Sequence, residues 1–400
     1  MSERRYDDNQ GGHMNGSPRR VLFYVQHLLG IGHIRRASLI VKAMAAEGLD
    51  VTLVSGGEPL ATMDIGSARL IQLAPVKAGD ARFSVLVDEL GQPIDDAWKA
   101  ARRARLLQVF AEVAPHVLLL EMYPFGRRKM SFELLPLLDA AQAARPRPCI
   151  ATSVRDILVR KDKAARNAEM AAIAERYLDL VLVHGDPSLV PFEATFLEAA
   201  RISERLRYTG YVVPDFAGPR GPDAPGYGEV IVSTGSGAVG PPLLQAVIDA
   251  RRLTSLRDRT WRLITGPNFP RDAEAALAAT APAGVVVERF RDDFLTLLAN
   301  CVLSISRAGY NTVMDLIRTR ARAVVIPFDE DEETEQALRA RLLAERGVVH
   351  VVPAADLTPA RIAAAVEAAL AGPPPAELGL DADGARRTAV LVRQAAERVA

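Results

Sequence analysis

The sequence has few cysteines, no excess charge of either sign and no long apolar run. Its 400 residues contain two cysteines, Cys149 and Cys301, too few for a disulfide framework or a cysteine metal site and typical of buried thiols in a reducing compartment. Lys+Arg and Asp+Glu balance at 49 each, so no global positive field indicates a nucleic-acid partner. No apolar stretch reaches the roughly 18 residues that span a bilayer.

Residues 1–20 are polar and lack the apolar core of a signal peptide. We interpret them as a disordered leader and expect the protein to be cytoplasmic.

Short apolar segments alternate with helical segments through both halves of the chain. Examples are VLFYV at 21–25 and VLLLE at 117–121 in the first half, and VIVST at 230–234 in the second. These segments are apolar throughout rather than alternating, which is typical of parallel strands buried on both faces. The helical segments between them fit βαβ crossovers. The sequence therefore predicts the α/β class, with two Rossmann-like domains whose parallel sheets face each other across a cleft.

A segment rich in proline and glycine, residues 212–228, separates the two series of strands and is typical of a linker. We expect an N-terminal domain over 21–211 and a C-terminal domain over 229–371. A second proline cluster precedes a basic amphipathic helix at 385–400, which we expect to pack back onto the N-terminal domain.

The stretch HLLGIGHIRRASLI, residues 27–40, follows the first predicted strand and opens a helix. Gly30 and Gly32 fit two positions of a dinucleotide fingerprint, but an arginine takes the third, so a nicotinamide or flavin cofactor is not expected. A helix dipole disfavours charge on His33, and a neutral imidazole suits a general base. The alternative is a capping or packing histidine, and His27 is the next candidate for the base.

Two strand-to-helix loops in the second half suit a nucleotide. The glycines and hydroxyls of STGSGAVG, 233–240, allow close approach to a phosphate or ribose, although a simple tight turn is the alternative. This loop lacks the P-loop lysine, which argues against a nucleoside triphosphatase. In SISRAGYNTVMDLI, 304–317, the turn from Ser306 to Gly309 precedes a helix start that favours a phosphate. Asp315, about one turn further, is placed to reach a ribose hydroxyl or is an ordinary surface acid.

The segment SRAGYNTVMDLI, followed by AVVIPF and EQALRARLLAERGVV, resembles the donor-binding signature of GT-B glycosyltransferases of family 28. VSTGSGAVG is similar to the upstream glycine loop of that family, and the clear resemblance covers about residues 228–370. It implies the two-domain GT-B fold and a hexosyltransferase that takes its sugar from a nucleoside diphosphate, with UDP-sugar as the expected donor.

The resemblance also implies a role for each matching residue. GIGH is similar to the glycine-rich loop of the family that ends in histidine, which places Gly30 and Gly32 in that loop and His33 beside the acceptor as the catalytic base. This chain has fewer glycines there than is usual in the family. The donor residues implied are Ser306 and Gly309 for the diphosphate, Asp315 for the ribose, the backbone at Phe290 and Arg291 for the uracil edge, Ser236 and Gly237 for the nucleotide pocket, and Glu335 and Gln336 for the sugar.

We expect inverting transfer without a metal or other cofactor, because a helix start at 306–309 can stabilise the departing diphosphate. The acidic triplet at 329–331 fits the Asp-x-Asp pattern of metal-dependent transferases, but we interpret it as a solvated turn. Two alternatives stay open on the same fold. One is a nucleotide-sugar hydrolase or 2-epimerase, and the other is a non-catalytic nucleotide-sugar-binding protein.

The acceptor hydroxyl is not identified by the sequence. Basic residues gather around Arg102–Arg105 and Arg127–Lys129. They fit either a solvated helix face or a surface for anionic lipid. With the resemblance, they favour a lipid-linked acceptor and peripheral contact with the inner face of the membrane. Uracil as the nucleotide base follows from the resemblance alone, and the sequence indicates neither the sugar nor the oligomeric state.

Overall fold

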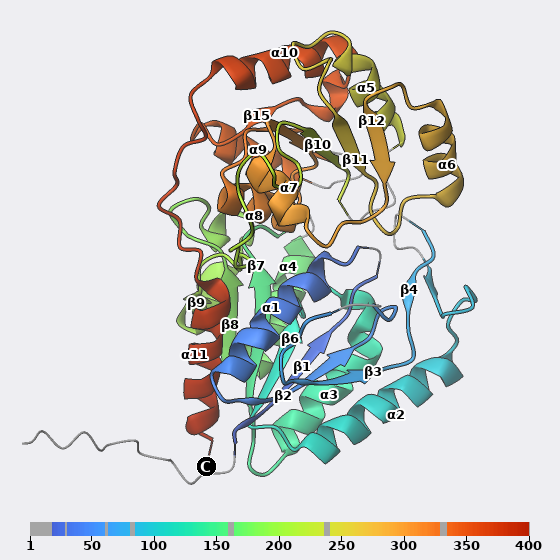
Figure 1. The fold of residues 1–400 in the computed structure, drawn as a ribbon. Helices are drawn as coiled ribbons and strands as arrows, with labels where there is room; N and C mark the ends of the chain where they lie inside the picture. Colours follow the sequence, from blue (N-terminus) through green and yellow to red (C-terminus); the bar gives the residue numbers. More distant parts are fainter. Residues whose placement is uncertain are drawn as a thin grey trace, which may run out of the picture.

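The structure, a computed structural model, describes residues 18–28, 30–60, 63–80, 85–158, 164–235, 241–328 and 334–399. Two α/β domains lie one above the other in Figure 1, the first coloured blue to green and the second mainly yellow to red. Each contains its own parallel sheet, which confirms the predicted architecture. Most of the predicted leader falls outside the described residues.

The N-terminal sheet has seven parallel strands in the order β3-β2-β1-β6-β7-β8-β9. Its order reverses at β1, which pairs with both β2 and β6. In sheet order the strands are β3 (Arg69–Gln72), β2 (Asp50–Ser55), β1 (Arg20–Val25), β6 (Val117–Glu121), β7 (Cys149–Arg155), β8 (Leu180–His184) and β9 (Leu206–Tyr208). The helices of this domain are α1 (Gly32–Ala46), α2 (Asp96–Val113), α3 (Ser131–Ala143) and α4 (Ala164–Tyr177), with short 3₁₀ turns at Arg128–Met130, Phe192–Ala194 and Ala199–Arg205. A small antiparallel pair, β4 (Lys77–Ala78) and β5 (Leu86–Val87), lies beside the sheet (Figure 1).

The C-terminal sheet has six parallel strands in the order β12-β11-β10-β13-β14-β15. Its order reverses at β10, which pairs with both β11 and β13. In sheet order the strands are β12 (Val285–Glu288), β11 (Trp261–Ile264), β10 (Val230–Ser233), β13 (Leu303–Ser306), β14 (Ala323–Val325) and β15 (His350–Val351). Its helices are α5 (Pro241–Arg251), α6 (Arg271–Thr280), α7 (Phe294–Asn300), α8 (Tyr310–Thr319), α9 (Glu335–Ala344) and α10 (Pro359–Ala371), with a 3₁₀ turn at Ala354–Asp356.

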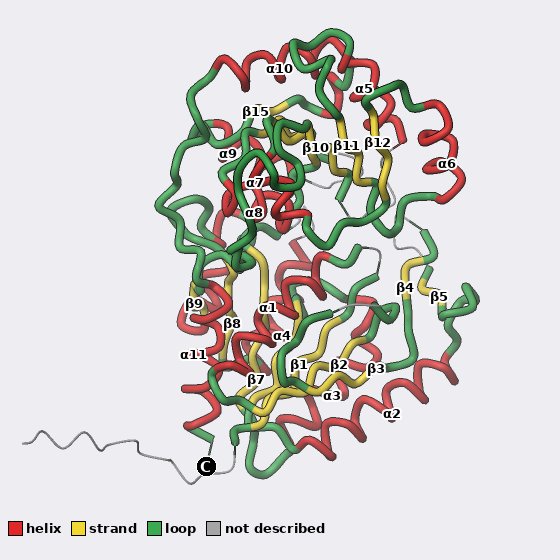
Figure 2. Tube along the Cα trace, viewed as in Figure 1, coloured by secondary structure: helices red, strands yellow, loops and turns green. Residues whose placement is uncertain are grey.

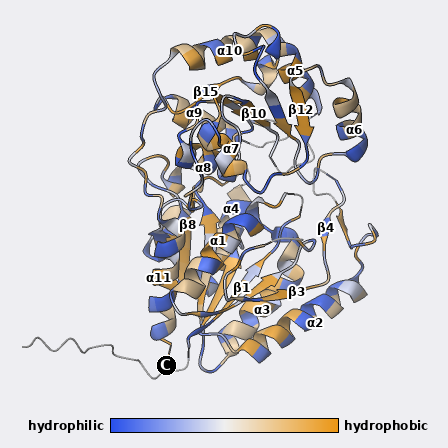
Figure 3. Ribbon diagram, in the orientation of Figure 1, coloured by the Kyte–Doolittle hydropathy of each residue, from blue (hydrophilic) through white to orange (hydrophobic). Residues whose placement is uncertain are grey.

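Burial explains why the apolar segments form central strands. All five residues of β6 are buried, and side chains of β1 pack into two separate hydrophobic clusters on opposite faces of the sheet. Figure 2 shows helices around the large sheet of each domain, and Figure 3 shows that many strands of these two sheets are mainly hydrophobic. Helix α1 starts at Gly32, within the stretch 27–40 that the sequence predicts to open a helix, and is followed by Gly48 with a φ of +81°. Glycine adopts this left-handed conformation without a steric penalty.

The last helix, α11 (Gly384–Glu397), leaves the C-terminal domain and packs on the N-terminal one. Its residues Ala389 and Val392 belong to the same buried cluster as Ile34 and Ile40 of α1. Figure 1 shows α11, in red, running beside the blue and green elements of the first domain. The chain therefore crosses between the domains twice.

Candidate active site at the domain interface

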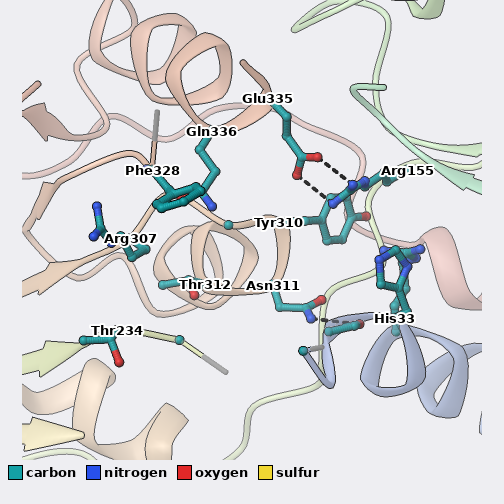
Figure 4. A pocket seen from close by; sticks show the side chains of 15 residues that line it. His33, Arg155, Thr234, Arg307, Tyr310, Asn311, Thr312, Phe328, Glu335 and Gln336 are labelled. Atoms are coloured by element: carbon teal, nitrogen blue, oxygen red, sulfur yellow. Dashed lines mark hydrogen bonds and ion pairs between the residues drawn. The ribbon is translucent and has the colours of Figure 1, made fainter. Parts of the chain in front are cut away.

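A cavity of about 300 Å³ lies where the carboxyl ends of the two sheets face each other. Ligands of open α/β sheets bind at such ends, next to the point where strand order reverses. The loops that follow β1 and β13, the two central strands next to those points, both reach the cavity. Its lining residues are Gly30, Gly32, His33, Arg36 and Arg155 from the N-terminal domain, and Thr234, Gly235, Arg307, Gly309, Tyr310, Asn311, Thr312, Phe328, Glu335 and Gln336 from the C-terminal domain (Figure 4).

His33, the second residue of α1, is held by a buried carboxylate. Its Nδ1 lies 2.7 Å from Oε1 of Glu121, the last residue of β6. Arg36, one turn further along α1, donates to the same carboxylate oxygen. Because an ionised carboxylate only accepts, the proton of the neutral ring sits on Nδ1. The lone pair of Nε2 is then available as a base on a ring that lines the cavity.

Burial sets the charge states of this pair. Burial is the main reason why the pKa of His33 is lowered to about 3, and the positive charge of Arg127 contributes to the same shift. Burial alone would raise the pKa of Glu121, but His33, Arg36 and Arg127 outweigh it and lower that pKa to about 2. At pH 7 the pair is therefore a neutral imidazole on a carboxylate. The imidazole is neutral as expected from the sequence, but burial rather than the helix dipole is the main cause.

The opposite wall is the start of helix α8. Gly309 is its N-cap residue and no side chain caps this end. Backbone N–H groups at a helix start favour an anion such as a phosphate. Beside it, Oε1 of Gln336 accepts hydrogen bonds from the backbone N–H groups of Ala308 at 3.2 Å and Phe328 at 3.1 Å. These two bonds fix the Gln336 amide at the cavity wall.

Ion pairs join the two domains around the cavity. Arg155, at the end of β7, donates to Glu335 at the start of α9 at 2.8 Å (Figure 4). Behind this pair, Arg339 of α9 is fully buried and bonds to Asp156 at 2.8 Å. Arg339 also donates to Glu335 Oε1, at 3.3 Å, and Arg155 Nη2 lies 2.7 Å from Glu335 Oε2.

Asp315 lies on α8 but is not among the residues that line the cavity. Its carboxylate is 1% exposed and accepts two hydrogen bonds from Arg35 of the other domain, at 2.9 and 3.0 Å. Burial raises the pKa of Asp315, and Arg35 opposes that shift. Contact with a ribose would require this ion pair to open, so the ribose role stays a prediction.

The remaining predicted donor residues lie apart from the cavity or outside the described residues. Ser306 ends β13 and is fully buried. Phe290 is 55% exposed in the turn after β12, and Arg291 is paired there with Asp293 at 2.7 Å. Ser236 and Gly237 lie outside the described residues. The structure thus brings together Gly30, Gly32, His33, Gly309, Glu335 and Gln336.

Sequence reasoning missed Glu121 and Arg155 as residues of the site. Both are the last residues of apolar strands, where charged side chains reach the ligand-binding edge of a parallel sheet. That position is the signal that could have identified them.

Two of the arginines expected on a basic surface, Arg102 and Arg127, are largely buried instead. Arg102 is 3% exposed and paired with Glu133 at 2.8 Å, and Arg127 has only 12% of its side chain exposed. Their stretches are basic in sequence, but these two guanidinium groups point into the domain. They cannot contribute to a membrane-facing patch.

Two observations bear on metals and membranes. In the described ranges, no group of three His, Cys, Asp or Glu residues is placed to hold a metal ion, and the acidic triplet at 329–331 falls outside those ranges. Likewise, among the helices described, none has the length and apolar character needed to cross a bilayer.

Part of the chain is similar in sequence to a known family of glycosyltransferases. Residues 230–382 match the family model of the glycosyltransferase family 28 C-terminal domain. Over 164 residues the chain is 30% identical to the UDP-N-acetylglucosamine–N-acetylmuramyl-(pentapeptide) pyrophosphoryl-undecaprenol N-acetylglucosamine transferase of Albidiferax ferrireducens, covering 40% of each protein. The chain spans 30% to 40% of the length of the curated relatives that it matches.

Several solved glycosyltransferase structures match almost the whole chain. The spinosyn rhamnosyltransferase SpnG, complexed with thymidine diphosphate, has a TM-score of 0.60 at 15% identity and covers 95% of this chain and 96% of its own. MurG of Acinetobacter baumannii has a TM-score of 0.54 at 16% identity, with coverage of 96% and 98%. The protein therefore has the GT-B fold of glycosyltransferases, and its C-terminal domain belongs to glycosyltransferase family 28.

Proposed function

We propose that this protein transfers a hexosyl unit from a nucleoside diphosphate sugar to an acceptor hydroxyl. The observation that carries the proposal is the pairing of two walls in one cavity. His33, with its carboxylate partner, lines the N-terminal side, and the uncapped start of α8 lines the C-terminal side. A base and an anion-stabilising helix start are the two groups that glycosyl transfer requires.

In this mechanism His33 Nε2 takes the proton from the acceptor hydroxyl as its oxygen attacks the anomeric carbon. The bond between that carbon and the diphosphate oxygen breaks, and the diphosphate leaves with the electron pair. Glu121 then stabilises the imidazolium across the 2.7 Å contact to Nδ1. Attack on the face opposite the leaving group inverts the anomeric configuration. The helix start of α8 holds the leaving diphosphate by its N–H groups.

We take the donor to be a UDP-sugar and the acceptor to be lipid-linked. Support comes from the name of the Albidiferax relative, which specifies UDP-N-acetylglucosamine and an undecaprenol-linked acceptor. The thymidine diphosphate bound to SpnG makes the thymine nucleotide the main competitor. A ligand that binds the native state raises the unfolding temperature by mass action. We expect UDP to raise it more than dTDP, ADP or GDP in a thermal-shift screen, and no shift with any of them would contradict the proposal.

Two other functions fit the same nucleotide pocket. A hydrolase or 2-epimerase would release or convert the nucleotide without a second substrate. Release of UDP from UDP-sugars at full rate without an acceptor would favour it. Tight nucleotide binding with no turnover under any acceptor would favour a non-catalytic binding protein.

A further inference from the structure

A second cavity, of about 540 Å³, lies in the C-terminal domain at the opposite end of its sheet from the active site. Residues just before β13 and β14 line this cavity, whereas residues after the same two strands line the active-site cavity. Helix α8 runs between the two, with Tyr310 at the active site and Thr319 at the second cavity. Small-molecule sites have volumes of about 300–1,000 Å³, so this cavity is large enough for a ligand. We call it the distal cavity.

The distal cavity lies where the two connections between the domains leave the C-terminal domain. The first connection, residues 212–228, contributes Arg220, and the second, residues 372–383, contributes Pro374 and Pro375. The C-terminal domain itself contributes the ends of helices α7 and α8. A ligand that fills this cavity can therefore contact both connections and the domain at once.

Three arginines line the distal cavity, Arg220, Arg320 and Arg322, and none of the described lining residues is an aspartate or a glutamate. Nη1 of Arg220 donates to the backbone oxygen of Ala299 at 3.1 Å, and Nη1 of Arg322 donates to three backbone oxygens at 2.7, 2.8 and 2.9 Å. Nη1 of Arg320 lies 3.5 Å from Glu377 Oε2. The Nε and Nη2 atoms of all three arginines make no hydrogen bond with the part of the chain that the structure describes. These atoms are the donors that a ligand could use.

The charge of the distal cavity is not balanced. Over the described ranges, Glu377 is the only carboxylate paired with one of these arginines. Its side chain is 77% exposed and that of Arg320 is 55% exposed, and an ion pair in contact with that much water contributes little. Guanidinium groups that share one cavity repel one another, and an oxyanion between them would remove that repulsion. They would bind it through charge-assisted hydrogen bonds.

We propose that the distal cavity binds a multivalent oxyanion, a diphosphate or a polycarboxylate, and that this anion joins the two connections to the C-terminal domain. Movement of one domain relative to the other must bend the connections, so the bound anion restricts that movement. The proposal is independent of sugar transfer, because no residue of the active-site cavity takes part in the anion site.

Isothermal titration calorimetry of the full-length chain tests the site. Inorganic pyrophosphate and citrate are titrated separately in saturating UDP, the nucleotide proposed to occupy the start of α8. We expect at least one of them to bind, with an affinity that falls as sodium chloride is added. The anion that binds more tightly identifies the ligand class as diphosphate or polycarboxylate.

Two arginine variants assign the binding to the distal cavity. Arg220→Gln and Arg320→Gln should each weaken it about tenfold or more, because a hydrogen bond to a charged group is worth at least about that factor in affinity. Arg322 is kept, since its Nη1 also holds the second connection at Gly372. Arg318→Gln is the matched control, because Arg318 lies on α8, is 40% exposed and does not line the cavity, and its removal changes the net charge equally.

Binding of neither anion by the wild type, or an equal loss of affinity in all three variants, would overturn the proposal. The unfolding temperature and UDP affinity of each variant are measured separately, and we expect no change in UDP affinity. A variant that does not fold, or a nucleotide site that does not bind UDP, is therefore distinguishable from loss of the anion site.

Hydrogen exchange tests the link to the two connections. Amide exchange in residues 216–228 and 372–378 should slow severalfold in the wild type at saturation with the tighter of the two anions. The same concentration should have little effect on Arg320→Gln. Exchange that stays unchanged in the wild type while the anion is bound would contradict the proposed joining of the connections.

Discussion

Glu121 determines how His33 can act. Its carboxylate is 1% exposed, so no solvent competes for the Nδ1 contact. The imidazole is thereby fixed in one tautomer, with Nε2 left for the acceptor. His27, the other candidate for the base, is 6% exposed, and its Nε2 lies 3.1 Å from the backbone oxygen of Glu58. It is not among the residues that line the cavity.

The roles of the pair can be separated by two substitutions. His33→Ala removes the base and should lower kcat by about 10²–10⁴-fold. Glu121→Gln keeps the shape of the side chain but removes the negative charge that stabilises the imidazolium. We therefore expect a smaller fall in kcat than in His33→Ala, by about tenfold to a hundredfold. Steady-state kinetics and UDP titrations measure both, and UDP affinity should not change in either. A near-normal kcat in His33→Ala would make this histidine structural and move attention to His27.

At the scale of elements, helix α8 serves both the cavity and the domain interface. Its first residues line the cavity, and Tyr310 there donates its hydroxyl to the backbone oxygen of His184 at 3.2 Å. Asn311 donates to the backbone oxygen of Gly32 at 2.9 Å, which ties the start of α8 to the start of α1. Further along, Asp315 is closed off by Arg35. Movement of α8 relative to α1 would therefore change the donor pocket.

The Arg35–Asp315 pair allows the ribose role to be tested directly. Asp315→Ala should weaken UDP binding by about 1–3 kcal/mol if the carboxylate binds the ribose. Arg35→Met is the matched variant, since it breaks the same ion pair but leaves the carboxylate available. It should keep UDP affinity or strengthen it, as measured by calorimetry. Equal losses in both variants would assign Asp315 to the domain interface alone.

Two groups could stabilise the leaving diphosphate: the N–H groups at the start of α8, or a metal ion held by the acidic triplet at 329–331. Only the second would make the reaction depend on a metal. If helix N–H groups hold the diphosphate, turnover should survive EDTA. The double variant Asp329→Asn with Asp331→Asn should also retain turnover. Activity lost in EDTA and restored only by Mg²⁺ or Mn²⁺ would instead make the triplet a metal site.

At the scale of the whole molecule, buried ionisable groups make stability depend on pH. His184 is fully buried between Ser153 Oγ at 2.6 Å and Thr209 Oγ1 at 2.8 Å. Burial lowers its pKa to about 3. Because its unfolded pKa is about 6.5, the unfolded chain binds a proton between these values while the folded one does not, and acid favours unfolding. His33 acts in the same direction, and Glu121 does so below about pH 4.5.

We expect the free energy of unfolding to be nearly constant between about pH 7 and 8 and to fall as the pH drops below that range. A histidine that stays neutral in the fold costs about 2 kcal/mol at pH 5 by this linkage. Urea unfolding curves between pH 7.5 and 5 measure the slope. His184→Asn should give a shallower slope, whatever its stability at pH 7. An unchanged slope would mean that His184 is protonated in the native state.

How well the sequence predicts each feature of the fold and the site depends on how far apart along the chain the interacting residues lie. Apolar segments and glycine loops are local patterns, so the strands, the βαβ order and the position of His33 could be predicted. Glu121 lies 88 residues from His33, and Arg155 lies 180 residues from Glu335. Pairings over such distances follow from strand order, which local patterns do not encode. For the same reason Arg102 and Arg127 looked like surface charges, although the fold buries them.

The two crossings between the domains meet at one place. The backbone N–H of Gly384 donates to the oxygen of Tyr211, and the N–H of Tyr211 donates to the oxygen of Asp381 at 2.6 Å. Val212 and Asp383 form a β-bridge there, and a Cβ at Gly384 would lie 2.5 Å from the backbone oxygen of Gly210. A single connection would let one domain swivel in any direction relative to the other. Two connections bonded together hold the domains to each other at this place, so we expect the cleft to open by rotation about it, with His33 and the start of α8 moving apart and the two connections staying together.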